Sequence, residues 1–264
     1  MSRPSRAVEL PEVTISESRG VRYLHLDTPW IQGAMRIDDP LVIELEYVQR
    51  MMAWMLFCDP ANLAGARAVQ LGLGAAAITR LCLSLGMRTT AVEINPQVVA
   101  ACRTWFRLPV QAYGLEVLTL DAAEFVADVE RAGSADVLAV DLYDHEAASP
   151  VLDSEAFYRG CQALLADGGL MTVNLFGRDA SFERSRRRIA AAFGADAVHE
   201  FKPTREGNVV VLAMKHVTVP GLDELARRAE NIQTRCKLPA RKWLRMLRLH
   251  PEPDPAPLPD LPPA

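Results

Sequence analysis

Short apolar runs alternate with longer amphipathic stretches through the middle of the chain. Runs of strand length lie at residues 68–71, 89–93, 116–120, 137–141 and 170–175. Helical patterns lie at residues 75–85, 96–106, 122–132, 154–165 and 181–193. A strand followed by a helix, repeated at this spacing, predicts a doubly wound and mostly parallel sheet.

The alternation breaks after the fifth strand–helix unit. Residues 197–202 and 208–215 are two further strand candidates, and the short stretch PTREG joins them. Such a connection predicts an antiparallel hairpin rather than another parallel unit. Five such units closed by a hairpin are the pattern of a Rossmann-like, AdoMet-methyltransferase-type α/β fold, predicted for residues 58–215. A simple dinucleotide dehydrogenase usually adds a sixth parallel strand instead.

The segments before this domain have a different character. Residues 1–20 are polar and are expected to be loose. Residues 21–26 alternate in strand fashion, and residues 31–35 are a second strand candidate, so a small N-terminal β region is predicted. Residues 41–57 are too long and apolar for one strand and predict a mostly buried helix. This N-terminal region spans residues 21–57.

The segments after it are basic and then rich in proline. Residues 216–249 are expected to form a helical basic extension, with one helix over 221–248. Its side chains Trp243, Leu244 and Leu247 are predicted to pack inward. Residues 250–264 predict a disordered or polyproline tail.

Composition narrows the classes of function. The 264 residues are 50% apolar and 23% charged, as in an ordinary soluble globular protein. The net charge of −4 gives no support for nucleic-acid binding. The chain shows neither a bilayer-length apolar run nor a signal-peptide pattern, so no membrane association is expected. Five scattered cysteines without a CxxC pair indicate reduced, mostly buried thiols, a cytoplasmic protein and no metal site.

Two glycines mark the first strand-to-helix turn, in the stretch VQLGLGAAAITRLCLSLGMRTTAVEINPQVV. Gly72 and Gly74 let a ligand approach the backbone, and the following helix N-terminus offers free N–H groups. Glu93 ends the next strand about 20 residues later, where a carboxylate can bind both ribose hydroxyls. Ala77 replaces the third glycine of a dinucleotide fingerprint, so the pattern indicates a nucleoside rather than a pyrophosphate.

Further carboxylates follow the next strands. Asp121 follows the third, Asp141 ends the fourth, and Asp144 lies three residues later. Asp121 has a simpler alternative role as a helix N-cap. Since ligands of open α/β sheets bind beyond the carboxyl ends of the strands, these groups and Glu93 predict a negatively charged cleft. Such a cleft suits a cationic substrate or a sulfonium.

A series of short motifs runs through residues 23–215 in a fixed order. Gln32 lies in WIQ, and Tyr47 lies in the helical stretch EYVQRMM. The later pieces are LGLG, AVEIN, LTLDAAEFV, VDLYDHEAASPVLDSEAFY, GGLMTVNL and PTREGNVV. In order and spacing these pieces resemble the spermidine synthase (polyamine aminopropyltransferase) family, in which EYVQRMM resembles the tyrosine-containing helix.

The resemblance implies a small N-terminal β domain, a Rossmann-like domain and decarboxylated AdoMet as the ligand. The implied cofactor-binding residues are Gln32, Gly72, Gly74, Glu93, Asp121, Ala122 and Asp141. Among them, Glu93 would bind the ribose and Asp121 the adenine amino group. A homodimer is expected from the resemblance alone.

The resemblance also implies the reaction. A small amine attacks the carbon next to the sulfonium, and methylthioadenosine leaves. The implied catalytic residues are Asp141, Asp144 and Tyr47. Asp141 would take a proton from the attacking amine, and Asp144 would help to place that amine. The chemistry agrees, because an amine is protonated at neutral pH and must lose a proton before it attacks.

The chain departs from the family's pattern around the acceptor. Residues 75–77 are alanines where the family carries an aspartate for the aminopropyl ammonium, and Arg205 and Glu206 replace residues of the family's hairpin. An altered acceptor site is therefore expected. An AdoMet-dependent methyltransferase that forms S-adenosylhomocysteine is an alternative, because these changes would accommodate the carboxylate of AdoMet. A non-catalytic nucleoside-binding protein is another.

Overall fold

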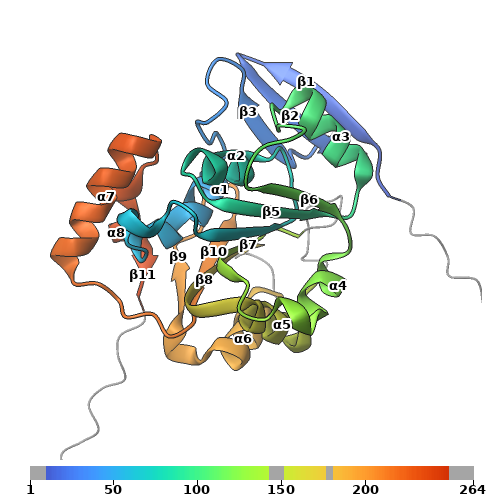
Figure 1. Ribbon diagram of the computed structural model, residues 1–264. Helices are drawn as coiled ribbons and strands as arrows, with labels where there is room; N and C mark the ends of the chain where they lie inside the picture. Colours follow the sequence, from blue (N-terminus) through green and yellow to red (C-terminus); the bar gives the residue numbers. More distant parts are fainter. Residues whose placement is uncertain (1–9, 143–151, 177–180, 250–264) are drawn as a thin grey trace, which may run out of the picture.

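The computed structural model describes residues 10–142, 152–176 and 181–249, in which two sheets form (Figure 1). The strands of the larger sheet, in spatial order, are β11 (Leu247–Arg248), β9 (Val198–Phe201), β10 (Asn208–Met214), β8 (Leu165–Phe176), β7 (Ala135–Val140), β4 (Arg67–Leu71), β5 (Arg88–Glu93) and β6 (Leu115–Thr119). The smaller sheet is antiparallel and contains β1 (Val13–Ser18), β2 (Val21–Leu26) and β3 (Gly33–Arg36).

Strand pairing confirms the predicted fold class. The pairs within β6, β5, β4, β7 and β8 are all parallel, whereas β10 pairs antiparallel with both β8 and β9. The order reverses between β4 and β7, because the chain first builds outward through β5 and β6. Such a switch point is where open α/β sheets bind ligands, beyond the carboxyl ends of the strands.

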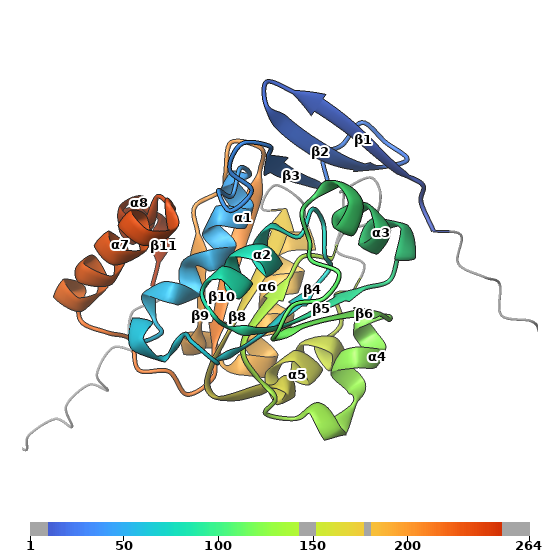
Figure 2. The same cartoon turned by 45° about the horizontal axis from the view of Figure 1, so that its top comes forward.

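Helices cover both faces of the larger sheet (Figure 2). They are α1 (Glu46–Met51), α2 (Ala77–Ser84), α3 (Pro96–Trp105), α4 (Ala122–Ala127), α5 (Glu155–Leu164), α6 (Ser181–Phe193), α7 (Leu222–Cys236) and α8 (Ala240–Met246). Short 3₁₀ turns lie at Met52–Leu56, Pro60–Asn62, Val129–Arg131 and Ala195–Ala197. None of the helices in the described ranges is long and apolar enough to cross a membrane.

Period-two alternation directs successive residues of the central strand β7 to two different cores. In β7, Val137 and Ala139 face the cluster that contains α1, α7 and α8, whereas Leu138 and Val140 face the cluster that contains α4, α5 and α6. Apolar residues on both faces are what a parallel sheet buried on both sides requires. The cysteines are free thiols and four of the five are buried, as predicted.

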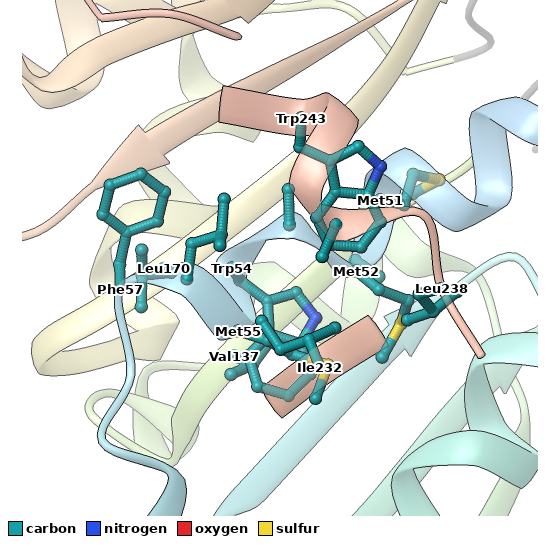
Figure 3. Packing of buried hydrophobic residues seen from close by; sticks show 14 of the residues in the cluster. Met51, Met52, Trp54, Met55, Phe57, Val137, Leu170, Ile232, Leu238 and Trp243 are labelled. Atoms are coloured by element: carbon teal, nitrogen blue, oxygen red, sulfur yellow. The ribbon is translucent and has the colours of Figure 1, made fainter. Parts of the chain in front are cut away.

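The C-terminal extension is interrupted, which corrects the single helix predicted over 221–248. Lys237 ends α7 in a left-handed conformation (φ 57°), Pro239 precedes α8, and β11 then pairs with β9. Trp243 is buried as predicted and packs in the core that also contains Trp54 (Figure 3). The prediction for Leu244 is wrong, because its side chain is 36% exposed.

The N-terminal region differs from the sequence prediction in two places. β1 forms within residues 1–20, which were expected to be loose, because its alternating Val13 and Ile15 pack against the core under α3. The helix predicted over 41–57 begins only at Glu46 and becomes a 3₁₀ turn at Met52. Residues 41–45 instead belong to the connection between β3 and α1.

Candidate active site

Gly72 brings the ends of β4 and β7 together. Its φ of +84° favours glycine, and a Cβ at this position would lie 2.2 Å from the carbonyl oxygen of Asp141. The Asp141 N–H donates to the Leu71 carbonyl at 3.0 Å. Gly74 approaches the N-terminal region, since its Cβ would lie 3.1 Å from the Gln32 carbonyl oxygen. The connection between β4 and α2, residues 72–76, is called the glycine loop, and it lies between Asp141 and Gln32.

Glu93 is held at the end of β5 by backbone N–H groups. Its Oε2 accepts from Leu73 N–H and its Oε1 from Asn95 N–H, both at 2.9 Å. Burial raises the pKa of the Glu93 carboxyl, and these hydrogen bonds offset part of that effect. Each carboxylate oxygen can accept more than one hydrogen bond, so the group can also bind the hydroxyls of a ligand.

Asp121 caps the helix that follows β6. Its Oδ1 accepts from Ala123 N–H at 2.7 Å, so its simpler role as the N-cap of α4 is confirmed. Ala122 is buried as the first residue of that helix. Contact of either residue with an adenine stays a prediction.

Gln70 is a functional candidate that the sequence analysis missed. Its Oε1 accepts from Thr79 N–H at 3.1 Å and from Thr79 Oγ1 at 2.6 Å, and its Nε2 donates to the Gly72 carbonyl at 2.7 Å. Gln70 thus satisfies an N–H in the first turn of α2, the end where dinucleotide folds bind phosphate. The loop therefore suits a nucleoside without a pyrophosphate. The available signal was a glutamine within the apolar strand RAVQL.

The start of α2 differs from the prediction. The helix begins at Ala77 rather than at Ala75, because Ala76 adopts a left-handed conformation with φ 57°. The first two alanines of the loop are buried, and a Cβ on Gly33 would lie 2.6 Å from the Cβ of Ala75. The start of β3 therefore packs directly on the glycine loop.

Asp141 is held by side chains from distant parts of the sequence. Its Oδ1 accepts from Asn174 Nδ2 at 2.9 Å, and the Tyr47 hydroxyl also donates to it. Burial raises the pKa of Asp141 above its usual value, and the two hydrogen bonds lower it in part. A carboxylate with a raised pKa at the switch point is suited to accept a proton from a substrate.

A buried chain of amides continues from Asp141 to the β9–β10 connection. Asn174 Oδ1 accepts from Asn208 Nδ2 at 3.1 Å, and Asn208 N–H donates to Thr204 Oγ1 at 3.1 Å. Because the Asn174 carbonyl accepts from Asn208, its NH₂ group faces Asp141. The sequence analysis did not identify these residues, although asparagines near the ends of apolar strands were an available signal.

A pocket lies between the glycine loop and the first helix. It brings together Gln32, Gly74, Tyr47 and Asp141 among the predicted site residues. Its described lining consists of Gln32, Gly33, Ala34, Ile43, Leu45, Tyr47, Val48, Gln70, Leu73, Gly74, Ala75, Ala77, Ile78 and Asp141.

The other predicted site residues lie along the same sheet edge or outside it. Gly72 lies in the glycine loop directly after β4, and Glu93 contacts this loop from the end of β5. Asp121 and Ala122 lie beyond them, after β6. Asp144 lies outside the described residues. Arg205 has an exposed side chain and is absent from the described pocket lining. Within the described ranges, no group of three or more His, Cys, Asp or Glu side chains is placed to hold a metal ion.

Solved structures show the same fold. A probable spermidine synthase from Corynebacterium glutamicum superimposes with a TM-score of 0.67 at 17% identity, covering 84% of this chain and 83% of that chain. Human methyltransferase-like protein 13, in complex with SAH, superimposes with a TM-score of 0.61 at 19% identity, covering 81% and 98%. The molecule therefore has an α/β fold of the type seen in spermidine synthases and methyltransferases.

Sequence relatives define the family within that class. No protein-family model matches the chain. A polyamine aminopropyltransferase from Neisseria meningitidis serogroup A is 33% identical over 235 residues, 87% of this chain and 86% of the relative. One from Chromobacterium violaceum is 30% identical over 246 residues, 92% of each. The chain belongs to the polyamine aminopropyltransferase family.

Proposed function

We propose that the protein transfers an aminopropyl group from decarboxylated AdoMet to a small amine. Family membership supports this reaction, and the observation that carries it is the placement of Asp141. This carboxylate has a raised pKa, lies at the switch point beside the glycine loop, and lines the pocket with Tyr47. The AdoMet-dependent methyltransferase alternative is not favoured by the relatives.

The proposed binding of the donor follows the edge of the sheet. Glu93 would bind the ribose hydroxyls, Asp121 and Ala122 would lie at the adenine, and Gly72 and Gly74 would let the sulfur end pass close to the backbone. The sulfonium would then lie between β4 and β7, next to Asp141. A positive sulfur centre is stabilised there by the nearby carboxylates.

The proposed reaction is a displacement with balanced atoms and charges. The acceptor ammonium gives a proton to the Asp141 carboxylate, and the resulting neutral nitrogen attacks the carbon next to the sulfonium. The N–C bond forms as the C–S bond breaks, and its electron pair neutralises the sulfur of methylthioadenosine. Tyr47 holds Asp141 in place, and alignment of nitrogen and sulfur supplies much of the rate.

The test compares the two donors with one protein preparation. Purified protein is given decarboxylated AdoMet and a panel of amines, and methylthioadenosine is measured by chromatography. Release of methylthioadenosine is expected. Release from no amine would refute the proposal, and formation of S-adenosylhomocysteine from AdoMet would support the methyltransferase instead. Calorimetry with both donors separates binding from turnover.

The assembly and the location of the protein are also proposals. We expect a homodimer in solution, which light scattering of the purified chain would measure. We expect a cytoplasmic protein, which fractionation of cells that express the full chain would test.

A further inference from the structure

A buried arginine binds the last part of the glycine loop. Arg80 lies on α2, and its side chain is enclosed by the protein. Its Nη1 donates to the Ala75 carbonyl at 2.5 Å and to the Phe106 carbonyl at 2.7 Å, and its Nε donates to the Pro40 carbonyl at 3.0 Å. One side chain therefore joins the glycine loop to the residue after α3 and to the connection between β3 and α1.

Four consecutive carbonyls of the glycine loop accept hydrogen bonds from buried side chains. The carbonyls of residues 72 and 73 accept from Gln70 Nε2 at 2.7 and 3.2 Å, and that of residue 74 accepts from Cys102 Sγ at 3.0 Å. Arg80 binds the carbonyl of residue 75, next to the left-handed Ala76. Since a non-glycine residue keeps this conformation only where its surroundings hold it, the strained end of the loop depends on Arg80.

Stability alone does not explain an arginine at this position. Burial lowers the pKa of the Arg80 guanidinium to about 10, so burying the charged group disfavours folding at neutral pH. An apolar side chain of similar size is often the more stable choice for such a place. What the arginine adds is a planar group that binds several carbonyls at once and fixes their relative positions.

The two ends of the glycine loop lie next to different parts of the proposed donor. The Leu73 N–H donates to Glu93, the proposed ribose-binding carboxylate. Ala75, near the other end, lines the pocket together with Asp141, beside which the sulfonium is proposed to lie. Displacement of the Ala75 end should therefore affect the sulfonium and aminopropyl part of the donor more than its nucleoside.

We propose that Arg80 is a positioning residue for the sulfonium and aminopropyl part of the donor. The inference rests on the proposed function and adds a residue to it. Arg80 acts through the carbonyls that it binds, because Ala75 lines the pocket from one side. The connection that begins at Pro40 contributes Ile43 and Leu45 to the same lining. Arg80 thus fixes two parts of the pocket relative to each other.

The first variant is Arg80→Met, which keeps an unbranched side chain and removes every hydrogen-bond donor. Calorimetry measures its affinity for decarboxylated AdoMet and for adenosine, which has neither the sulfonium nor the aminopropyl group. The affinity for decarboxylated AdoMet is expected to fall about 10-fold and that for adenosine less than about 2-fold, because the Glu93 end of the loop keeps its own hydrogen bond. An equal fall for both ligands, or no fall for either, would overturn the inference.

Arg228→Met is the matched control. Arg228 is an arginine of α7 whose Nη1 also donates to two backbone carbonyls, those of Leu56 at 3.2 Å and Cys58 at 2.9 Å. Neither carbonyl belongs to the glycine loop. This variant should lower the Tm and leave the ratio of the two affinities unchanged, so a loss of stability alone does not reproduce the expected result.

Arg80→Lys tests the planar group and serves where Arg80→Met does not fold. Lysine keeps the positive charge, but its single ammonium lacks the fork of donors that binds separate carbonyls. The ratio of the affinity for decarboxylated AdoMet to that for adenosine is expected to fall about 3- to 10-fold. A ratio equal to that of the unchanged protein would overturn the inference, because a point charge would then be sufficient.

The outcomes also separate this inference from the proposed function. An unchanged affinity ratio in an Arg80→Met protein that still releases methylthioadenosine would refute the role of Arg80 and leave aminopropyl transfer standing. Binding of decarboxylated AdoMet without release of methylthioadenosine from any amine would refute aminopropyl transfer. The affinity ratio would still decide the role of Arg80, since calorimetry needs no turnover.

Discussion

The two halves of the site hold their carboxylates in different ways. On the nucleoside side, Glu93 and Asp121 accept hydrogen bonds from backbone N–H groups, including those two residues further along, at Asn95 and Ala123. On the acceptor side, Asp141 accepts from the side chains of Asn174 and Tyr47, which come from other elements. The backbone of the fold alone sets the first arrangement, whereas the second depends on which side chains are present.

This difference indicates where the family's activity can diverge. Only a substitution to proline removes a backbone N–H group, so a nucleoside site held by such groups persists as the sequence changes. The acceptor side has no such constraint, because Asp141 is held by side chains that a substitution can replace. Substitutions in the two halves should therefore have separable effects, on nucleoside affinity and on turnover.

The largest effect is expected from Asp141→Asn. Asparagine keeps an oxygen that can accept from Asn174 but cannot take the proton of the amine, so kcat should fall by about 100- to 10,000-fold. The affinity for methylthioadenosine should stay near that of the unchanged protein, measured by calorimetry. Retention of most of the activity would show that another group takes the proton.

Glu93→Gln should give the opposite pattern. The new amide NH₂ faces a backbone N–H where a carboxylate oxygen accepted before, and the group no longer offers charged acceptors to the ribose. Affinity for methylthioadenosine should fall about 10- to 100-fold, as expected for lost hydrogen bonds to a charged group, with little change in kcat at saturating donor.

A matched control lies on the neighbouring strand. Glu116→Gln changes an exposed β6 carboxylate whose described partner is Thr90, so nucleoside affinity should be unchanged. A loss of kcat in Glu93→Gln as large as that in Asp141→Asn would contradict the separation of the two halves.

The same division explains what could be predicted from the sequence. The alternation of strands and helices predicted the sheet, and the ends of the strands predicted the positions of Glu93, Asp121 and Asp141. Both patterns can be identified in short stretches of sequence. Gln70, Asn174 and Asn208 were missed since their roles depend on partners brought near by folding. A polar residue in an apolar strand indicates such a partner but does not identify it.

Tertiary contacts also account for the errors in the element boundaries. The helix predicted from residue 41 begins at Glu46, because Ile43 and Leu45 before it line the pocket beside the glycine loop. The C-terminal helix breaks at Lys237 so that Trp243 enters the core and β11 reaches β9. In both places, packing overrides the local helical pattern.

The smallest expected effect tests how far the side-chain network reaches. Asn208 Nδ2 donates to Asn174 Oδ1 and so helps to orient the Asn174 NH₂ group toward Asp141. Asn208→Leu removes this hydrogen bond and should weaken the one between Asn174 and Asp141. Loss of that donor raises the pKa of Asp141 further. Since the ionised carboxylate is the active form, the acid limb of the kcat/KM profile should move to higher pH, and kcat/KM below it should fall about 3- to 10-fold. Val209→Ala is the matched control, because Val209 lies on the opposite face of β10 in the core that contains α4, α5 and α6. This variant should destabilise the protein without moving the acid limb of the pH profile. A limb that stays in place in a folded Asn208→Leu protein would show that the network ends at Asn174.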